Sequence, residues 1–428
     1  MQGHKPLNTH MTTNKPYGCY RLLHTADWHL GKMLNDQSRD EEHAQFLEWL
    51  LLAVKEHEVD SIVLAGDVFD SANPPQSALS RYYNFVSELF RQGICAFAVV
   101  GGNHDSSAQL EAPKNALHAL KAHVAGHLAE NPADRILRLP NSENPRVAVA
   151  MIPFLRDRDL RVGKDGEGAD EIREQLVAGI KKRYEEAAIA IEPLKCPVLA
   201  TGHLTVSGAS ASDSEREIHI GGMGAVGPDI FPKEFGYIAL GHLHRPQAVD
   251  PHGRIRYAGS PIALSFSEAE DKKEVRILDV TPDGITHFGL SVPVFRKLTQ
   301  IRTTKAGLEQ ELASIDATSS VLRPWVEVVV EDAGLETDLV ERVRSLSAGK
   351  HFDVLKILRG KNAVISGMAV GEASDDEAIE RLLEAPSRVF EHLLDEHRNL
   401  TEEETDSLKT TFQILIELSQ QFEPANLK

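Results

Sequence analysis

The sequence predicts a layered α/β domain, followed by a small α+β domain and a helical tail. Three observations carry this prediction. Short apolar runs of strand-like composition alternate with amphipathic helical patterns through most of the chain. A second pattern, in which strands and helices alternate, begins near residue 296. From residue 371 onward, apolar residues recur at helical spacing behind helix-capping signals.

The composition limits the class of protein. The chain has 428 residues, 42% of them hydrophobic, so it can bury a large core and more than one domain is expected. It contains no apolar run of about 18 residues, so no membrane span is predicted. Residues 1–19 are polar and lack the apolar core of a secretory signal, and we expect them to form a disordered leader. The three widely spaced cysteines favour a reducing, cytoplasmic location over a disulfide framework or a zinc-thiolate site.

The formal net charge of −18 argues weakly against a phosphate-rich substrate, because phosphate contacts require Lys and Arg. The acidic excess is uneven, however. Residues 371–428 contain 15 Asp and Glu against 5 Lys and Arg, which is more than half of the excess. Bound divalent metal ions would offset more of it locally. The charge therefore does not exclude a nucleic-acid substrate.

Five apolar runs share one design, since each is short, strand-like and ends in polar residues. They are RLLHTADWH (21–29), DSIVLAGDVFD (60–70), AFAVVGGNHD (96–105), CPVLATGHL (196–204) and YIALGHLH (237–244). Residues 38–57 and 75–93 lie between such runs and show the helical period. In layered α/β domains, ligands bind where the strands end. The five polar clusters therefore indicate one shared site.

Further elements divide the rest of the chain. Residues 257–280 read as additional strands and close the first domain, predicted to span 20–290. The β-α-β-α-β pattern predicts a small domain over 291–370. Residues 371–428 carry two helix starts with capping boxes, Ser374 with Glu377 and Thr401 with Glu404. The apolar stripes of these helices suit either an intramolecular core or a partner surface, and the terminal position favours the partner.

The strand ends carry oxygen and imidazole ligands, which suit manganese, iron or zinc. They are Asp27, His29, Asp67, Asp70, Asn103, His104, Asp105, His203, His242 and His244. One metal ion does not need so many ligands, whereas two ions bridged by one carboxylate would use them. The D-x-H and H-x-H spacings suit a strand or its exit loop, where residues i and i+2 point the same way.

Each residue also has an ordinary interpretation. A single histidine such as His203 is more often hydrogen-bonded than ligating, and Asp70 could be a turn residue. Asp105 could cap the following helix. We expect four other histidines to be ordinary: His57, His118, His123 and His219. Coincidence would have to place a ligand-type residue at the same edge of five separate strands, so we predict a metal centre.

The segments DWH, GDVFD, GNHD, GH and GHLH resemble the calcineurin-like metallophosphoesterase superfamily. The longer pattern of HTADWHLGK, GDVFDSANPP, GGNHDS and GHLHRPQ resembles its SbcD family of bacterial nuclease subunits. The resemblance covers residues 20–290 and extends more loosely beyond them. It implies a two-sheet sandwich flanked by helices, a capping domain and a helical segment that binds a coiled-coil ATPase of the SbcC kind.

The resemblance also implies residue roles. One metal ion would be held by Asp27, His29, Asp67 and His244, and the other by Asp67, Asn103, His203 and His242. Asp67 would bridge two divalent ions, Mn²⁺ being the expected metal. His104 would stabilise the phosphoryl group without ligating, and Asp70 would orient His104.

The implied activity is Mn-dependent 3′-to-5′ exonuclease action on double-stranded DNA, with endonuclease action on single strands and hairpins. Ser71 follows Asp70 where protein phosphatases of the superfamily carry an arginine, which weakens a phosphatase interpretation. No Walker A sequence occurs, so a partner would use the ATP. The family also forms homodimers through helices near the site, for which residues 75–93 and 113–123 are candidates. Tyr82, Tyr83 and Phe90 look exposed there, although ordinary burial is equally compatible.

Two other functions remain open from the sequence. One is a metallophosphoesterase acting on a small phosphodiester or nucleotide, and the other is a structural subunit that only binds a partner. Residues that contact DNA carry no motif. Lys32, Arg39 and Arg245 lie near the ligand clusters and could touch phosphate, although surface ion pairs are the preferred interpretation.

Overall fold

The structure is a computed structural model. It describes residues 14–162, 167–212, 215, 225–318, 320–333, 338–360, 390, 408 and 412. The chain divides into two units, Met1–Gly360 and Lys361–Lys428. Most of the predicted leader, both capping boxes and His219 lie outside the described residues.

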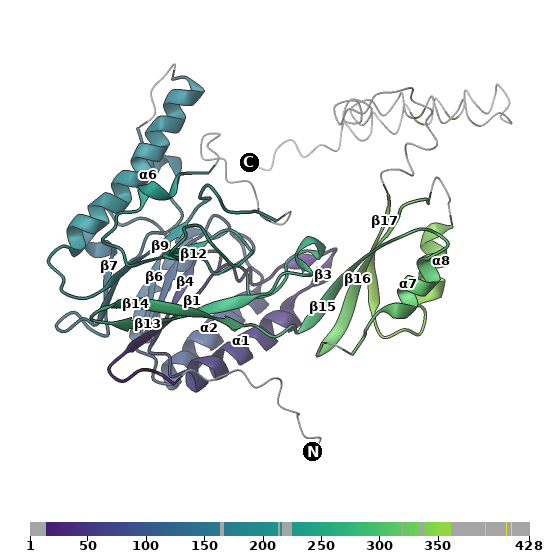
Figure 1. Ribbon diagram of the computed structural model, residues 1–428, viewed down its shortest axis with the longest axis horizontal. Helices are drawn as coiled ribbons and strands as arrows, with labels where there is room; N and C mark the ends of the chain where they lie inside the picture. The colour runs from purple at the N-terminus through teal and green to yellow at the C-terminus, as the bar shows by residue number, and fades with distance from the viewer. Residues whose placement is uncertain are drawn as a thin grey trace. The chain divides into compact units, whose positions relative to one another are not determined.

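The first unit contains two six-stranded sheets (Figure 1). In order across the first sheet, the strands are β14 (Gly284–Ser291), β13 (Glu274–Thr281), β1 (Tyr20–Thr25), β4 (Ser61–Ala65), β5 (Ala96–Val100) and β6 (Ala122–Ala125). In the second sheet they are β11 (Gln247–Ala248), β12 (Ile255–Tyr257), β10 (Tyr237–Gly241), β9 (Val198–His203), β8 (Val147–Ala150) and β7 (Ile136–Leu139). The run from β1 to β6 is parallel, as are β8, β9, β10 and β12. The carboxyl ends of the five predicted strands therefore meet at common edges.

The two sheets pack face to face, which confirms the predicted sandwich. Their shared core includes Leu22 and Val63 from the first sheet and Leu199 and Ala239 from the second. Every residue of β1, β4, β5, β9 and β10 is buried. This is why these strands read as continuous apolar runs.

Helices cover the outer faces. α1 (Asp40–Glu56) and α2 (Gln76–Arg91) pack on the first sheet around Trp28 and Phe97, and α6 (Ala169–Ile191) packs on the second. Of the two interpretations that the sequence left open for Tyr82, burial is the one observed, because this side chain is 1% exposed and contacts Phe97. Phe90, for which both interpretations were also open, is 40% exposed.

The remaining short elements join the layers. The helices are α3 (Ser107–Glu111), α4 (Lys114–Ala119), α5 (Asp157–Leu160) and the 3₁₀ turns η1 (Pro132–Arg135), η2 (Pro228–Ile230) and η3 (Phe266–Glu268). β2 (Met33–Leu34) and β3 (Gln37–Ser38) pair as a small hairpin.

The expected β-α-β-α-β module is present. It comprises β15 (Arg296–Thr303), α7 (Leu308–Ser314), β16 (Leu322–Val330), α8 (Leu339–Ser347) and β17 (Asp353–Arg359). Its three strands are parallel, with β16 in the centre, and the valines of β16 pack against both helices. The module contacts α1 through Arg296, whose guanidinium lies 2.7 Å from Glu41 Oε2 and stacks 4.2 Å from the Trp325 ring centre.

In the second unit, Phe390 and Phe412 are helical and their rings stack with centres 3.9 Å apart. None of the helices in the described part of the chain is long and apolar enough to cross a membrane.

Candidate metal centre

Loops that leave β1, β4, β5, β9 and β10 bring the predicted ligands together. In the described residues, ligand atoms of Asp27, His29 and Asp67 lie within 4.8 Å of one another, as do those of His29, Asp70 and His104. His203 Nε2 lies 3.3 Å from Asp67 Oδ2, and His242 contacts the His203 ring with centres 5.5 Å apart. The His244 ring packs on His29 with centres 5.0 Å apart.

Four of these residues have left-handed backbone conformations. The φ angles are 52° for Asp27, 47° for His29, 49° for Asp67 and 98° for His242. Such conformations are costly outside glycine and persist where the surroundings impose them. Here the amide of Asp27 donates to Gly66 O, and that of His29 donates to Asp67 O, both at 3.0 Å. Of the two settings that we expected for the i, i+2 pairs, a strand or its exit loop, the pairs thus converge in exit loops, where part of the backbone is left-handed.

Steric crowding explains why glycine occupies position 66 in GDVFD and position 102 in GGNHD. A Cβ on Gly66 would lie 2.1 Å from His203 Nδ1, and one on Gly102 would lie 2.1 Å from Asp67 Oδ1. No side chain fits at either position, because the ligands pack directly against the glycine backbone.

Several buried ligand atoms lack a hydrogen-bond partner. Asp27 Oδ2 and His29 Nε2 are buried and unpartnered among the described residues. Such groups are expensive to bury unless they bind a metal or a charge. The two ring nitrogens of His203 face Ala65 O at 3.0 Å and Asn103 Oδ1 at 2.9 Å, so both carry protons in this arrangement. A cation that replaced the Nε2 proton would meet His203, Asn103 and Asp67 together. The donor set therefore fits divalent metal ions.

Charges across the site are strongly coupled. Burial raises the pKa of Asp27 to about 7 and lowers the pKa of His29 to about 4. Burial alone would lower the pKa of His203, but the Asp67 and Asp27 carboxylates outweigh it and raise that pKa to about 9. The protonated His203 ring thus supplies a positive charge beside Asp67 and Asp27, in the place that a bound cation would take.

Three of the predicted ligand histidines have Nδ1 held by a group that is not itself a predicted metal ligand. His29 Nδ1 lies 3.2 Å from Asp70 Oδ1, and His203 Nδ1 lies 3.0 Å from Ala65 O. His244 Nδ1 lies 3.2 Å from Glu268 Oε1. This pattern is typical of metal-binding histidines, because it fixes the tautomer and leaves Nε2 as the ligand atom. Sequence reasoning missed Glu268, which lies in the SFSEAE segment that we assigned only to strands.

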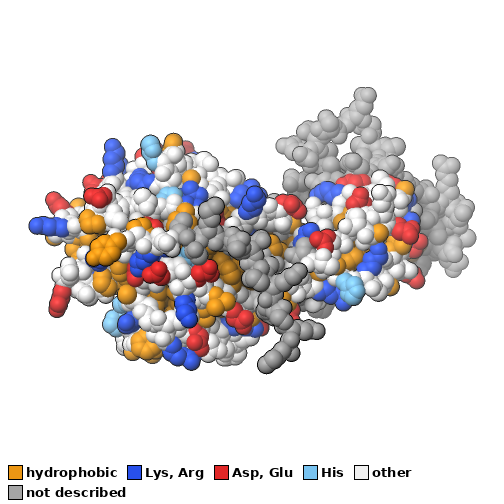
Figure 2. Space-filling model, turned by 60° about the horizontal axis from the view of Figure 1, so that its bottom comes forward, with side chains coloured by type: hydrophobic (Ala, Val, Ile, Leu, Met, Phe, Trp, Pro, Cys, Tyr) orange, Lys and Arg blue, Asp and Glu red, His pale blue; other side chains and the backbone are white. Residues whose placement is uncertain are grey.

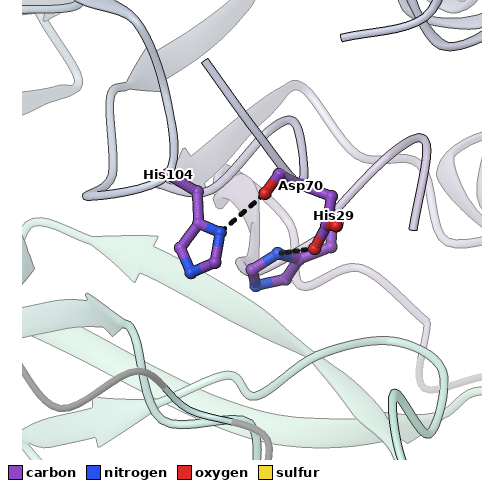
Figure 3. A group of neighbouring side chains, drawn as sticks. All are labelled: His29, Asp70 and His104. Carbon is purple, nitrogen blue, oxygen red and sulfur yellow. Dashed lines mark hydrogen bonds and ion pairs between the residues drawn. The ribbon is translucent and has the colours of Figure 1, made fainter. Parts of the chain in front are cut away.

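His104 and Asp70 interact differently from the expectation (Figure 3). His104 Nδ1 donates to the backbone carbonyl oxygen of Asp70 at 2.7 Å. The Asp70 carboxylate instead faces His29 and the Lys32 ammonium, which lies 3.1 Å away. Since a carbonyl oxygen only accepts, Nδ1 of His104 carries a proton. Asp70 therefore orients two histidines, one through its backbone and one through its side chain.

Asp105 does not cap the following helix. Ser106 is the N-cap residue of α3 and accepts from the amide of Gln109 at 3.3 Å. The buried Asp105 carboxylate accepts from the amides of Val68 at 3.1 Å, Phe69 at 3.0 Å and Gly102 at 2.9 Å. It thereby ties the loop after β4 to the loop after β5.

The remaining candidates have ordinary roles. Lys32 and Arg245 pair with Asp70 and Asp271, which favours the ion-pair interpretation. Arg39 pairs with Glu42, but both side chains are buried, so this is not the surface ion pair that we expected. His118 and His123 pack on each other with ring centres 5.0 Å apart, and neither belongs to the two ligand groups of the described residues.

A two-sheet sandwich with this ligand cluster at its strand ends defines a metallophosphoesterase. A family model described as calcineurin-like phosphoesterase matches residues 20–246, and one described as type 5 capsule protein repressor C-terminal domain matches 294–398. The chain is 32% identical over 391 residues to the D subunit of nuclease SbcCD from Escherichia coli K12, covering 87% of this chain and 96% of that protein. The same protein of Rhodobacter capsulatus is 36% identical over 322 residues (72% of this chain, 78% of that protein). That of Bacillus subtilis is 36% identical over 266 residues (61% and 66%).

The chain therefore belongs to the calcineurin-like phosphoesterase family and, within it, to the SbcD family. By this membership it is a metal-dependent phosphoester hydrolase.

Proposed function

We propose that this protein is the nuclease subunit of an SbcCD-type complex and hydrolyses DNA phosphodiester bonds with two divalent metal ions. The proposed metal is Mn²⁺. The observation that carries the proposal is the convergence of ligand atoms from Asp27, His29 and Asp67 next to the His104 ring. Among them, Asp27 Oδ2 and His29 Nε2 are buried without a hydrogen-bond partner in the described residues. The relatives, which are named as D subunits of nuclease SbcCD, support DNA as the substrate.

The proposed ligand sets are those that the family resemblance implied. The first set is Asp27, His29, Asp67 and His244, and the second is Asp67, Asn103, His203 and His242. When bound, such ions supply Lewis-acid polarisation of the phosphodiester and lower the pKa of water.

His104 would act on the substrate directly. Its Nδ1 proton is committed to Asp70 O, so Nε2 is the atom left for the substrate. A proton at Nε2 would stabilise charge on a phosphoryl or leaving-group oxygen, which is electrostatic stabilisation of the transition state. Asp105 would keep the loops of Asp67 and His104 in register.

Binding of DNA would depend on local groups. On the face in Figure 2, Lys and Arg side chains are interspersed with Asp and Glu side chains and hydrophobic ones. Such a mixed surface provides little long-range attraction for phosphate. Bound metal ions and the β15–β17 module would then position the duplex.

The finer assignment follows the family. We propose 3′-to-5′ exonuclease action on double-stranded ends and endonuclease action on single strands and hairpins, in DNA repair, recombination and replication. Residues 371–428 would bind an SbcC-like coiled-coil ATPase in the cytoplasm, at the nucleoid. A homodimer would form through α2 and the α4 region, where Phe90 is exposed and Tyr82 is not.

The test is cleavage of an end-labelled hairpin duplex by the purified chain with an SbcC-type partner, ATP and Mn²⁺. We expect wild type to cut and His104→Ala to lose about 10²–10⁴-fold in rate while still binding Mn²⁺. The matched control is His252→Ala, an exposed histidine in the turn before β12, at the opposite end of the parallel strands.

Hydrolysis of a small chromogenic phosphodiester without DNA cleavage would contradict the nuclease function and support a metallophosphoesterase that acts on a small phosphodiester or nucleotide. Partner binding without any hydrolysis would indicate a structural subunit.

A further inference from the structure

Glu268 is a fully buried carboxylate beside the proposed metal centre. It ends the 3₁₀ turn η3, and its relative exposure is 0%. Oε1 lies 3.2 Å from His244 Nδ1, and Oε2 lies 2.5 Å from the Lys273 ammonium. The amide of Leu264 also donates to Oε2 at 3.2 Å.

Both members of the buried ion pair hold the same histidine. Lys273 Nζ donates to the backbone carbonyl of His244 at 2.9 Å and to Ser260 Oγ at 3.0 Å, while Glu268 contacts the ring. Burying a carboxylate and an ammonium costs desolvation energy, and apolar residues of similar size often stabilise a fold better. Stability alone therefore does not explain why this pair surrounds His244.

The same arrangement recurs at two other histidines of the site. His29 Nδ1 faces Asp70 and His203 Nδ1 faces Ala65 O. A carboxylate on the outer nitrogen fixes the tautomer and ring orientation of a metal-binding histidine and increases its basicity. Glu268 occupies that position for His244, whose ring packs against His29 in the cluster.

We infer that Glu268 is a positioning residue that holds His244 with Nδ1 as the donor, so that Nε2 is the atom that would bind one divalent cation, with Lys273 as the counter-charge of Glu268. This inference rests on the proposed ligand set. It adds to that set a residue from outside the GHLH motif.

The test measures Mn²⁺ binding to the metal-free full-length chain by isothermal titration calorimetry, with the thermal midpoint recorded in parallel. Wild type should bind two ions. Because Glu268→Ala leaves Lys273 buried and unpaired, the main variant is Glu268→Met with Lys273→Met, which replaces the pair by apolar side chains of similar length. We expect this double variant to fold and to bind one of the two ions about 10–100-fold more weakly.

Two further variants separate positioning from packing. Glu268→Gln keeps an acceptor for Nδ1, so its loss of affinity should be smaller than that of the double variant. Glu270→Gln removes an exposed carboxylate two residues away and should leave both affinities unchanged.

Wild-type affinity for both ions in the folded double variant would overturn the inference, as would equal weakening of both ions. Absence of any Mn²⁺ binding by wild type would instead overturn the metal centre itself, so the two failures are distinguishable.

Discussion

The backbone carbonyl oxygen of Asp70 lies 2.7 Å from His104 Nδ1, whereas the Asp70 carboxylate lies 3.2 Å from His29 Nδ1. One residue thus orients a proposed ligand and a proposed substrate-binding histidine through two different groups. Substitution of its side chain should remove the partner of His29 and of Lys32 and leave the contact to His104, because the backbone carbonyl remains in every variant.

Asp70→Ala should therefore weaken metal binding. Without the carboxylate, His29 loses the partner that fixes its tautomer, and we expect Mn²⁺ affinity to fall about 10–100-fold at one ion. Asp70→Asn keeps an acceptor and should lose less. Calorimetric titration with Mn²⁺ checks both variants against Asp283→Ala, an exposed position in the β13–β14 turn. Unchanged affinity in Asp70→Ala would show that the carboxylate does not support His29.

The sequence predicted the elements that apolar patterning determines. The buried strands were evident because their runs are continuously apolar and end in polar residues, as in AFAVVGGNHD. The roles of Asp70, Asp105 and Glu268 were not evident from the sequence. Asp70 acts through its backbone carbonyl, Asp105 accepts from backbone amides, and Glu268 contacts a histidine ring that is distant in the sequence. Residue type indicates that a carboxylate can accept hydrogen bonds or bind a cation, but it does not indicate which group is its partner.

Metal removal should reverse which of two proteins, wild type or Asp27→Asn, has the larger free energy of unfolding. Asp27 Oδ2 is buried and unpartnered, and Asp67 lies beside it. In EDTA, Asp27→Asn removes one of two close charges, so its free energy of unfolding should exceed that of wild type by about 1–2 kcal/mol. In saturating Mn²⁺ wild type should be the more stable, since ligand binding at about 100 times Kd adds about 2.7 kcal/mol.

Urea unfolding at pH 8 with EDTA or with Mn²⁺ measures both orders. Asp283→Asn serves as the control and should follow wild type in each. If Asp27→Asn is the less stable protein in EDTA as well, the unpartnered carboxylate is not a source of strain.

His24 should make the stability depend on pH. It bridges the sheets, with Nε2 3.2 Å from Leu240 O and Nδ1 3.1 Å from the Tyr237 hydroxyl. Nε2 must donate to the carbonyl, and in the neutral ring that burial favours Nδ1 accepts from the tyrosine hydroxyl. Burial lowers the pKa of His24 from 6.5 to about 3.

Because the folded pKa is the lower one, the stabilisation from His24 is present above pH 6.5 and is lost as the pH falls towards 3. At pH 5 the loss is about 2 kcal/mol. Urea unfolding of wild type and His24→Asn at pH 8 and pH 5, both in EDTA, isolates this contribution in the difference between the two proteins. His252→Asn, at an exposed position, should show the pH dependence of wild type. Parallel pH dependences of wild type and His24→Asn would contradict a neutral buried ring.

Asp105→Asn should destabilise the protein without touching a ligand. The carboxylate accepts three amide hydrogen bonds, two at Oδ2 from Val68 and Gly102 and one at Oδ1 from Phe69. An asparagine has one acceptor oxygen, so its amino group must face at least one backbone N–H. Hydrogen bonds to a charged acceptor contribute about 1.5–3 kcal/mol each, and a buried donor left unpaired adds to the cost. We expect urea unfolding in EDTA to show a loss of about 2–4 kcal/mol in the free energy of unfolding relative to wild type, with Asp283→Asn unchanged.

The Asp105→Asn variant should also bind Mn²⁺ more weakly while it is still folded, because the loop after β4 carries Asp67 and the loop after β5 carries Asn103. A stable variant with wild-type Mn²⁺ affinity would show that the two loops hold their register without this carboxylate.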